Sequence, residues 1–199
     1  MQEFTKDESL EDEEIEERLK QLSQEAFDDP CIMLRELAQL SGEKTSQAPM
    51  EDAGLKSVLF EKLNEMRMSY SYKPLLIKAM LEYADEKNGT CPMEDIIFYF
   101  RDFYTKRRLK GLFVEKEKSI FSREGFSDRE ARRIILIYPY KRFANFRLLY
   151  YKKEEELLGF HPYLWESLSQ KEKEEMKAVC DSALERYYMR FYSKVQEDK

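Results

Sequence analysis

The fold is decided by residues 127–160, which read SDREARRIILIYPYKRFANFRLLYYKKEEELLGF. The stretch opens on a Ser-x-x-Glu capping box, which typically starts a helix, and Pro139 is expected to end that helix. Two runs rich in aromatic and branched residues follow at 146–151 and 156–160, separated by polar residues. Such runs predict two strands joined by a turn, so a short helix followed by a β-hairpin is expected here.

Upstream of this stretch, apolar residues recur at helical spacing in three segments, near 53–67, 74–86 and 93–109. Thr90 and Cys91 predict a very short strand before the last of these helices. From residue 73 to residue 160 the expected order is helix, short strand, helix, helix, strand, turn, strand. That is the order of a winged helix, a helix-turn-helix variant with a β-hairpin wing. The fold class predicted is mostly helical α+β with a winged-helix-like core.

One feature argues against groove reading by such a core. Residues 111–126, between the second and third expected helices, are irregular and longer than a compact helix-turn-helix needs. A winged helix that serves protein contacts, or a different small α+β arrangement, stays open as the alternative.

The two ends of the chain complete the expected domain organisation. A second capping box at Ser169 predicts a long C-terminal helix, whose aromatic stripe is expected to serve as core or as a homodimer interface. The polar residues 42–52 predict a linker, which separates an acidic helical appendage at 1–41 from the domain 53–199.

Charge is distributed unevenly along this charge-rich chain. Charged residues make up 37% of it and the net charge is −6. Residues 1–20 carry nine acids against three bases, whereas residues 101–147 carry fourteen bases against six acids. The acidic character of the whole chain argues against a general nucleic-acid binder, but a local basic region within it does not. A simple solvated surface is the competing interpretation.

The residues expected to contact nucleic acid are cations on the third helix, just after it, and on the wing. Arginine binds phosphate or guanine in bidentate fashion, and lysine supplies a point charge. The predicted set is Arg129, Arg132, Arg133, Lys141, Arg142, Lys152 and Lys153.

One segment also resembles a known family. Residues 70–112 read YSYKPLLIKAMLEYADEKNGTCPMEDIIFYFRDFYTKRRLKGL. This pattern, which continues towards Trp165, resembles C-terminal accessory regions of bacterial superfamily II helicases from mobile or defence loci. The chain has no Walker A lysine loop, so the resemblance implies an accessory module encoded by a phage, a mobile element or a defence system. It transfers no catalytic residue.

No catalytic motif, cofactor motif or metal-ligand motif is found in the sequence. The single histidine, His161, and three scattered cysteines match neither a zinc site nor a Cys–His nucleophile. Asp95, Asp102 and Asp128 are the carboxylates nearest the basic region, but their spacing matches no nuclease signature. The prediction is therefore a non-enzyme without cofactor or metal.

The alternative function is a protein-interaction or inhibitor module, such as an anti-CRISPR protein, acting on a nucleic-acid-processing complex. Its acidic N-terminal helix would engage a basic surface in a partner, or cover the basic region of its own chain. The acids expected to do so are Glu11, Asp12, Glu13, Glu14, Glu16 and Glu17. No membrane contact is expected, and the composition favours the cytoplasm.

Overall fold

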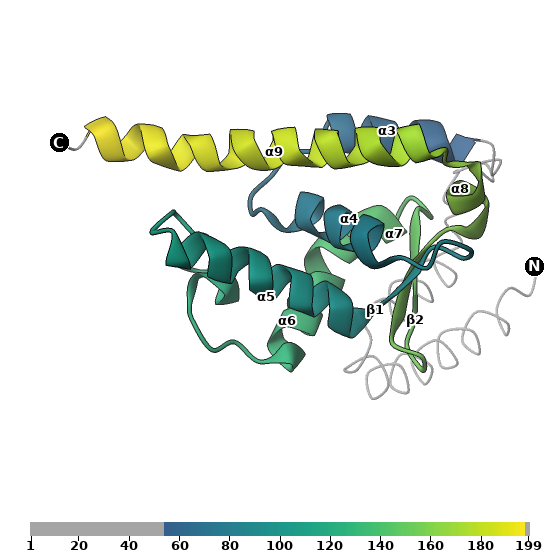
Figure 1. The fold of residues 1–199 in the computed structure, drawn as a ribbon, viewed down its shortest axis with the longest axis horizontal. Coiled ribbons are helices and arrows are strands. Elements are labelled where there is room, and N and C mark those ends of the chain that lie inside the picture. The colour runs from purple at the N-terminus through teal and green to yellow at the C-terminus, as the bar shows by residue number, and fades with distance from the viewer. Residues whose placement is uncertain (1–53, 198–199) are drawn as a thin grey trace, which may run out of the picture. The chain divides into compact units, whose positions relative to one another are not determined.

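The computed structural model describes residues 54–197, with side chains as far as Phe191. These residues belong to a unit that begins at Met50. Their architecture is mostly helical α+β, with a small three-stranded antiparallel sheet and a long C-terminal helix (Figure 1). The expected acidic appendage, the linker and the acids Glu11 to Glu17 lie outside the described residues.

The first half of this unit follows the apolar periodicity of the sequence. Buried leucines lie on one side of α3, and α4 buries most of its apolar residues, from Tyr72 to Met80. The predicted helix at 93–109 is confirmed with the same bounds, and Gly111 follows its end with a positive φ of 64°. The elements are α3 (Leu55–Asn64), α4 (Tyr72–Tyr83), β1 (Thr90–Pro92) and α5 (Met93–Leu109).

The helix that begins after Ser127 is the third helix of the expected order from residue 73, and we keep the name third helix for it. It is longer than expected, and the prediction that Pro139 ends it is wrong. α6 (Asp128–Ile135) continues without a break through a π-helical turn (Leu136–Tyr140) into α7 (Lys141–Ala144). Proline lacks the N–H that an α-helical turn uses and its ring clashes with the preceding turn, whereas a wider turn relieves both problems. Pro139 is buried in that turn, which packs against α4, so tertiary packing retains the helix past it.

The predicted hairpin is confirmed as β2 (Leu149–Lys152) and β3 (Leu157–Phe160). β3 lies in the centre of the sheet, between β1 and β2, and both pairings are antiparallel. Tyr150 pairs with Gly159, and the tyrosine ring occupies the space that a side chain at 159 would need.

The chain ends in α8 (Pro162–Ser167), which the sequence did not indicate, and α9 (Gln170–Glu197), which it did. Ser169 and Glu172 form the expected capping box at the start of α9, with Ser169 N donating to Glu172 at 2.8 Å. α9 packs along α3 and α4 (Figure 1). Its apolar stripe, Met176, Cys180, Leu184 and Tyr187, is buried in the core. Among residues 54–197 no helix has the length and hydropathy that a membrane crossing requires.

The irregular residues 111–126 fold against the helices that they connect. Phe121 is fully buried and stacks on Tyr104 at a centroid distance of 4.8 Å, with Phe126 at its edge. Arg108 donates to the backbone oxygens of residues 121–123. The insertion is thus part of the core, with its own short 3-10 turn at Ile120–Ser122.

The turn before β1 depends on a glycine, and its replacement gives a stability prediction. Gly89 has φ of 68°, and a Cβ there would lie 2.5 Å from Trp165 Cγ. We expect Gly89→Ala to lower the free energy of unfolding by about 2 kcal/mol, combining left-handed strain with overpacking. Gly111→Ala, at φ 64° with nothing within 4 Å, is the control and should cost only about 1 kcal/mol. Equal losses in denaturant unfolding would contradict the packing shown for Trp165.

Candidate nucleic-acid interface

The acidic side chains of the third helix are engaged by bases from outside that helix. Asp128 forms an ion pair with Arg101 on α5, and Glu130 forms one with Arg123 in the insertion. Glu130 also closes the capping box by accepting from Ser127 N at 2.9 Å. These hydrogen bonds lower the pKa of Glu130, followed in effect by the charge of Arg123. Both carboxylates of α6 are therefore engaged in contacts at the N-terminal end of the helix.

Four cations of the same helix form no ion pair with any described residue, and we call them the basic face: Arg129, Arg133, Lys141 and Arg142. Arg129, Arg133 and Arg142 are exposed, and Lys141 is half-buried. The exposed positions 129, 133, 137 and 142 are four, four and five residues apart. That spacing follows one side of a helix whose last interval crosses the wider π-helical turn.

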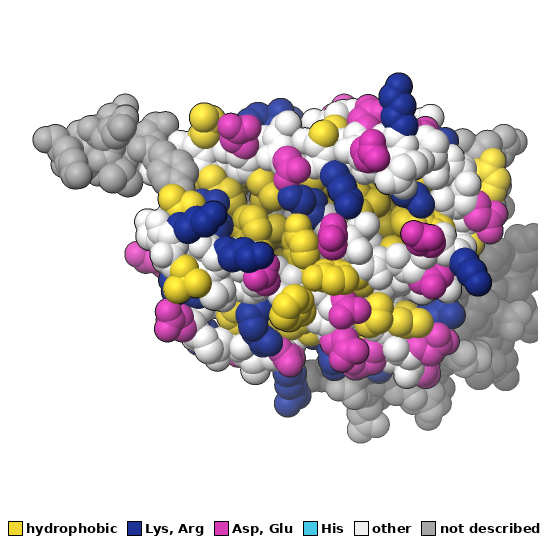
Figure 2. All heavy atoms as spheres, in the orientation of Figure 1, with side chains coloured by type: hydrophobic (Ala, Val, Ile, Leu, Met, Phe, Trp, Pro, Cys, Tyr) yellow, Lys and Arg dark blue, Asp and Glu magenta, His cyan; other side chains and the backbone are white. Residues whose placement is uncertain are grey.

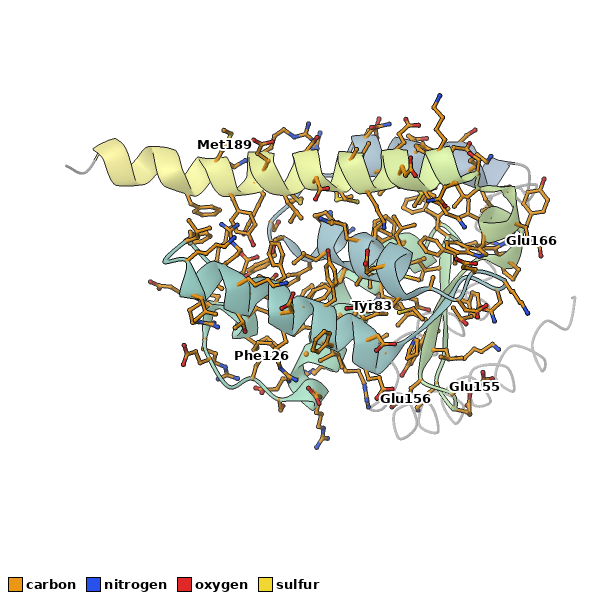
Figure 3. The ribbon with its side chains drawn as sticks, in the orientation of Figure 1. Tyr83, Phe126, Glu155, Glu156, Glu166 and Met189 are labelled. Atoms are coloured by element: carbon orange, nitrogen blue, oxygen red, sulfur yellow. The ribbon has the colours of Figure 1, made fainter. Side chains whose placement is uncertain are left out.

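The remaining predicted contacts lie beside acids. Arg132 forms an ion pair with Glu156 at 2.6 Å, and Lys152 lies 3.4 Å from Glu155. Lys153 is exposed at the hairpin turn, where three glutamates follow it. Figure 3 shows Glu155 and Glu156 at the tip of the hairpin. The structure therefore places four of the predicted cations along one helix, whereas the tip of the β-hairpin is mixed in charge and mainly acidic.

The basic face ends in a hollowed region with an aromatic wall. A cleft of about 550 Å³, which we call the tyrosine cleft, lies between the start of α4 and the π-helical turn. Its lining includes no acid and comprises Ser69, Tyr70, Tyr72, Lys73, Ile137, Tyr138, Pro139, Lys141, Arg142 and Asn145. An adjoining cleft of about 600 Å³ shares Lys73 and Arg142 and adds Lys62, Arg67 and one acid, Glu65.

Lys73 and Arg142 place two positive charges close together at the junction of the clefts. Partial burial of Lys73 lowers the pKa of its ammonium group, and the charge of Arg142 lowers it further. The Lys73 ammonium donates to the backbone oxygen of Arg67, but no carboxylate pairs with it among the described residues. An anion bound between Lys73 and Arg142 would relieve this repulsion, so the arrangement favours phosphate.

A buried carboxylate fixes the backbone from which the tyrosines of the cleft project. Glu115 is only 4% exposed and accepts from Ser71 N at 2.9 Å and from Ser71 Oγ at 2.7 Å. It also accepts from Tyr187 OH on α9. Ser71 Oγ in turn accepts from Tyr104 OH at 2.7 Å. Since Ser71 lies between Tyr70 and Tyr72, Glu115 anchors the backbone between these two tyrosines from the inside of the molecule.

The structure also places the residues considered for catalysis. Asp102 pairs with Lys106 at 2.7 Å, and Asp128 is engaged by Arg101. Within residues 54–197 no group of three His, Cys, Asp or Glu side chains is arranged to hold a metal ion. Burial raises the pKa of Cys91 and of Cys180 to about 12, so both thiols stay protonated.

Sequence reasoning missed the cleft residues contributed by α3, α4 and the loop between them: Lys62, Arg67, Tyr70 and Lys73. Tyr138 follows Ala131, Ile134 and Ile135 at helical spacing in the sequence, yet it is 53% exposed. A helical wheel that allowed for a wider turn at Pro139 would have placed Tyr138 on the outside.

The surface over α9 and α5 differs from the basic face in its charge. On it, Lys and Arg side chains are intermingled with Asp and Glu (Figure 2).

No protein-family model matches the chain, and no curated protein or solved structure matches it either.

Proposed function

We propose that this chain is a non-catalytic nucleic-acid-binding accessory module, in which a winged-helix-like core presents the basic face to duplex phosphates. The observation that carries the proposal is the charge arrangement of the third helix. Its acids are paired with Arg101 and Arg123, while Arg129, Arg133, Lys141 and Arg142 stay free of described acidic partners on its exposed side. Cations arranged along one helix face match the spaced charges of a nucleic-acid backbone.

The topology supports the winged-helix part of the proposal. The order α4, β1, α5, α6, β2, β3 is that of a winged helix, and β1 joins the hairpin through β3. The insertion packs in the core through Phe121, which is buried and stacks on Tyr104 of α5, with Phe126 of the same segment at the edge of its ring. The resemblance of residues 70–112 to helicase accessory regions points to the same class of partner.

The acidic hairpin tip determines which mode of binding is proposed. Glu154, Glu155 and Glu156 would repel phosphates, so we assign the contact to the third helix and not to the wing. Because the third helix exposes few base-reading groups beyond three arginines, the proposed mode is backbone contact with little sequence preference.

The test is a fluorescence anisotropy titration of the full chain with a random-sequence duplex DNA at two salt concentrations. Neutralising about four phosphates should make log K fall with log salt concentration with a slope of about −3.6. Salt-insensitive binding, or none at the lower salt concentration, would contradict the proposal.

A second candidate function is favoured by the charge of the N-terminus, where residues 1–20 carry nine acids against three bases. In that case the chain engages a basic partner, such as a nucleic-acid-processing complex, through its acidic N-terminal segment. Deleting residues 1–28 should then abolish the partner complex and leave the melting temperature of the domain unchanged. An increase in DNA affinity after the same deletion would instead indicate that the segment covers the basic face in its own chain.

A further inference from the structure

The tyrosine cleft and the basic face form one continuous surface. Lys141 and Arg142 belong to both, and Arg142 also lines the adjoining cleft. A nucleic-acid strand whose phosphates contact the third helix along its length would therefore reach the tyrosine cleft at the C-terminal end of that helix. The lining of the cleft differs from the exposed side of the third helix because it contains aromatic rings as well as cations.

The rings are arranged as a stacking surface with an open side. Tyr70 and Tyr72 stack with centroids 4.9 Å apart and planes within 9°. Tyr138 lies 6.5 Å from Tyr72 and stays 53% exposed although it borders the cleft. Bases stack on such rings without sequence preference, provided that they are not already paired in a duplex. A volume of about 550 Å³ falls in the range of sites for small ligands, about 300–1,000 Å³.

The polar groups of the cleft fit the rest of a nucleotide. Lys73 and Arg142 carry positive charge at its junction with the second cleft, and no acid lines it. The Asn145 amide, exposed at the rim, supplies a donor and an acceptor for a base edge. The combination of an exposed ring, an amide, and cations that form no ion pair with a described carboxylate matches a nucleotide better than it matches a peptide or an apolar ligand.

We propose that the tyrosine cleft binds an unpaired nucleotide of a strand that continues past the duplex, with its base against Tyr138 and its phosphate on Lys73 and Arg142. The inference rests on the proposed function and refines it. The preferred substrate is a junction between duplex and single strand, and blunt duplex is a weaker ligand.

The experiment compares the affinity of the full chain for a blunt duplex with its affinity for the same duplex carrying an oligothymidine extension on either strand. We expect the extension on one of the two strands to tighten binding about tenfold, which corresponds to the stacking of one base. Tyr138→Ala should reduce that affinity ratio to about one, and Tyr138→Phe, which keeps the ring, should retain it. Tyr163→Ala is the matched control, since Tyr163 is 46% exposed on α8, outside the cleft and the basic face.

The outcomes separate this inference from the proposed function. If the chain binds the blunt duplex and neither extension increases the affinity, the proposed function stands but the assignment of the cleft is wrong. A gain that survives Tyr138→Ala, with melting temperature unchanged, also overturns the assignment. Saturable binding of free thymidine monophosphate without duplex would point to a diffusible nucleotide and overturn it as well. A chain that binds no duplex loses the proposed function, and this inference with it.

Discussion

Charge reversal of Arg129 and Arg133 together is expected to lower the affinity for duplex DNA about a hundredfold at physiological salt. Both side chains are exposed, one helical turn apart on α6, and neither is tied to a described acid. Each reversal removes one phosphate contact and adds a repulsive charge in its place. Titration of the Arg129→Glu, Arg133→Glu double variant by fluorescence anisotropy measures the loss, and its melting temperature should match that of the native chain.

The control for this result is a second pair with the same chemistry. Arg186 and Arg190 are exposed on α9, also four residues apart, and α9 lies on the face where acids and bases are intermingled (Figure 2). Reversing both changes the net charge by the same amount. An equal loss of affinity in the control would mean that DNA responds to net charge alone, and the basic face would have no special role.

Removal of the Glu115 carboxylate is expected to lower the free energy of unfolding by about 3 kcal/mol. In Glu115→Ala, Ser71 N, Ser71 Oγ and Tyr187 OH lose their acceptor in a buried environment. Burial raises the pKa of Tyr187, followed in effect by its hydrogen bond to Glu115, so this hydroxyl stays protonated and needs an acceptor. Urea unfolding measures the loss.

Glu117→Ala is the matched control, because Glu117 is an exposed acid of the same segment, two residues away. It should change the free energy of unfolding by less than about 0.5 kcal/mol. If both variants lost the same small amount, Glu115 would not be the buried acceptor that the structure shows. A large loss for Glu115→Ala would also explain why a charged residue in an irregular segment is retained in the core.

Elements with a strong local signal could be predicted from the sequence. The helix at 93–109, both capping boxes and the β-hairpin follow from apolar periodicity and from Ser-x-x-Glu spacing, and all are found. Such features depend on neighbours within a few residues, which the sequence displays directly.

Pro139 and Glu115 show where local reasoning ends. Proline in a helical pattern normally marks its end, but packing of the π-helical turn against α4 offsets that tendency. Glu115 would ordinarily be solvated, yet Ser71 and Tyr187, far away in the sequence, supply enough donors to bury it.

The candidate site was predictable only in part, for the same reason. The cations Arg129, Arg133, Lys141 and Arg142 stand out because they are close in sequence. Pairing of Arg132 with Glu156, and juxtaposition of Lys73 with Arg142, depend on how distant segments meet.

Photo-crosslinking tests the central claim most directly, since it reports which surface faces the nucleic acid. A benzophenone side chain in place of Ile137, 43% exposed between Arg133 and Arg142, should crosslink to a bound duplex. The same group in place of Phe98, 58% exposed on α5, should not. Equal crosslinking at both positions, or crosslinking from position 98 alone, would contradict the assignment of the third helix as the interface.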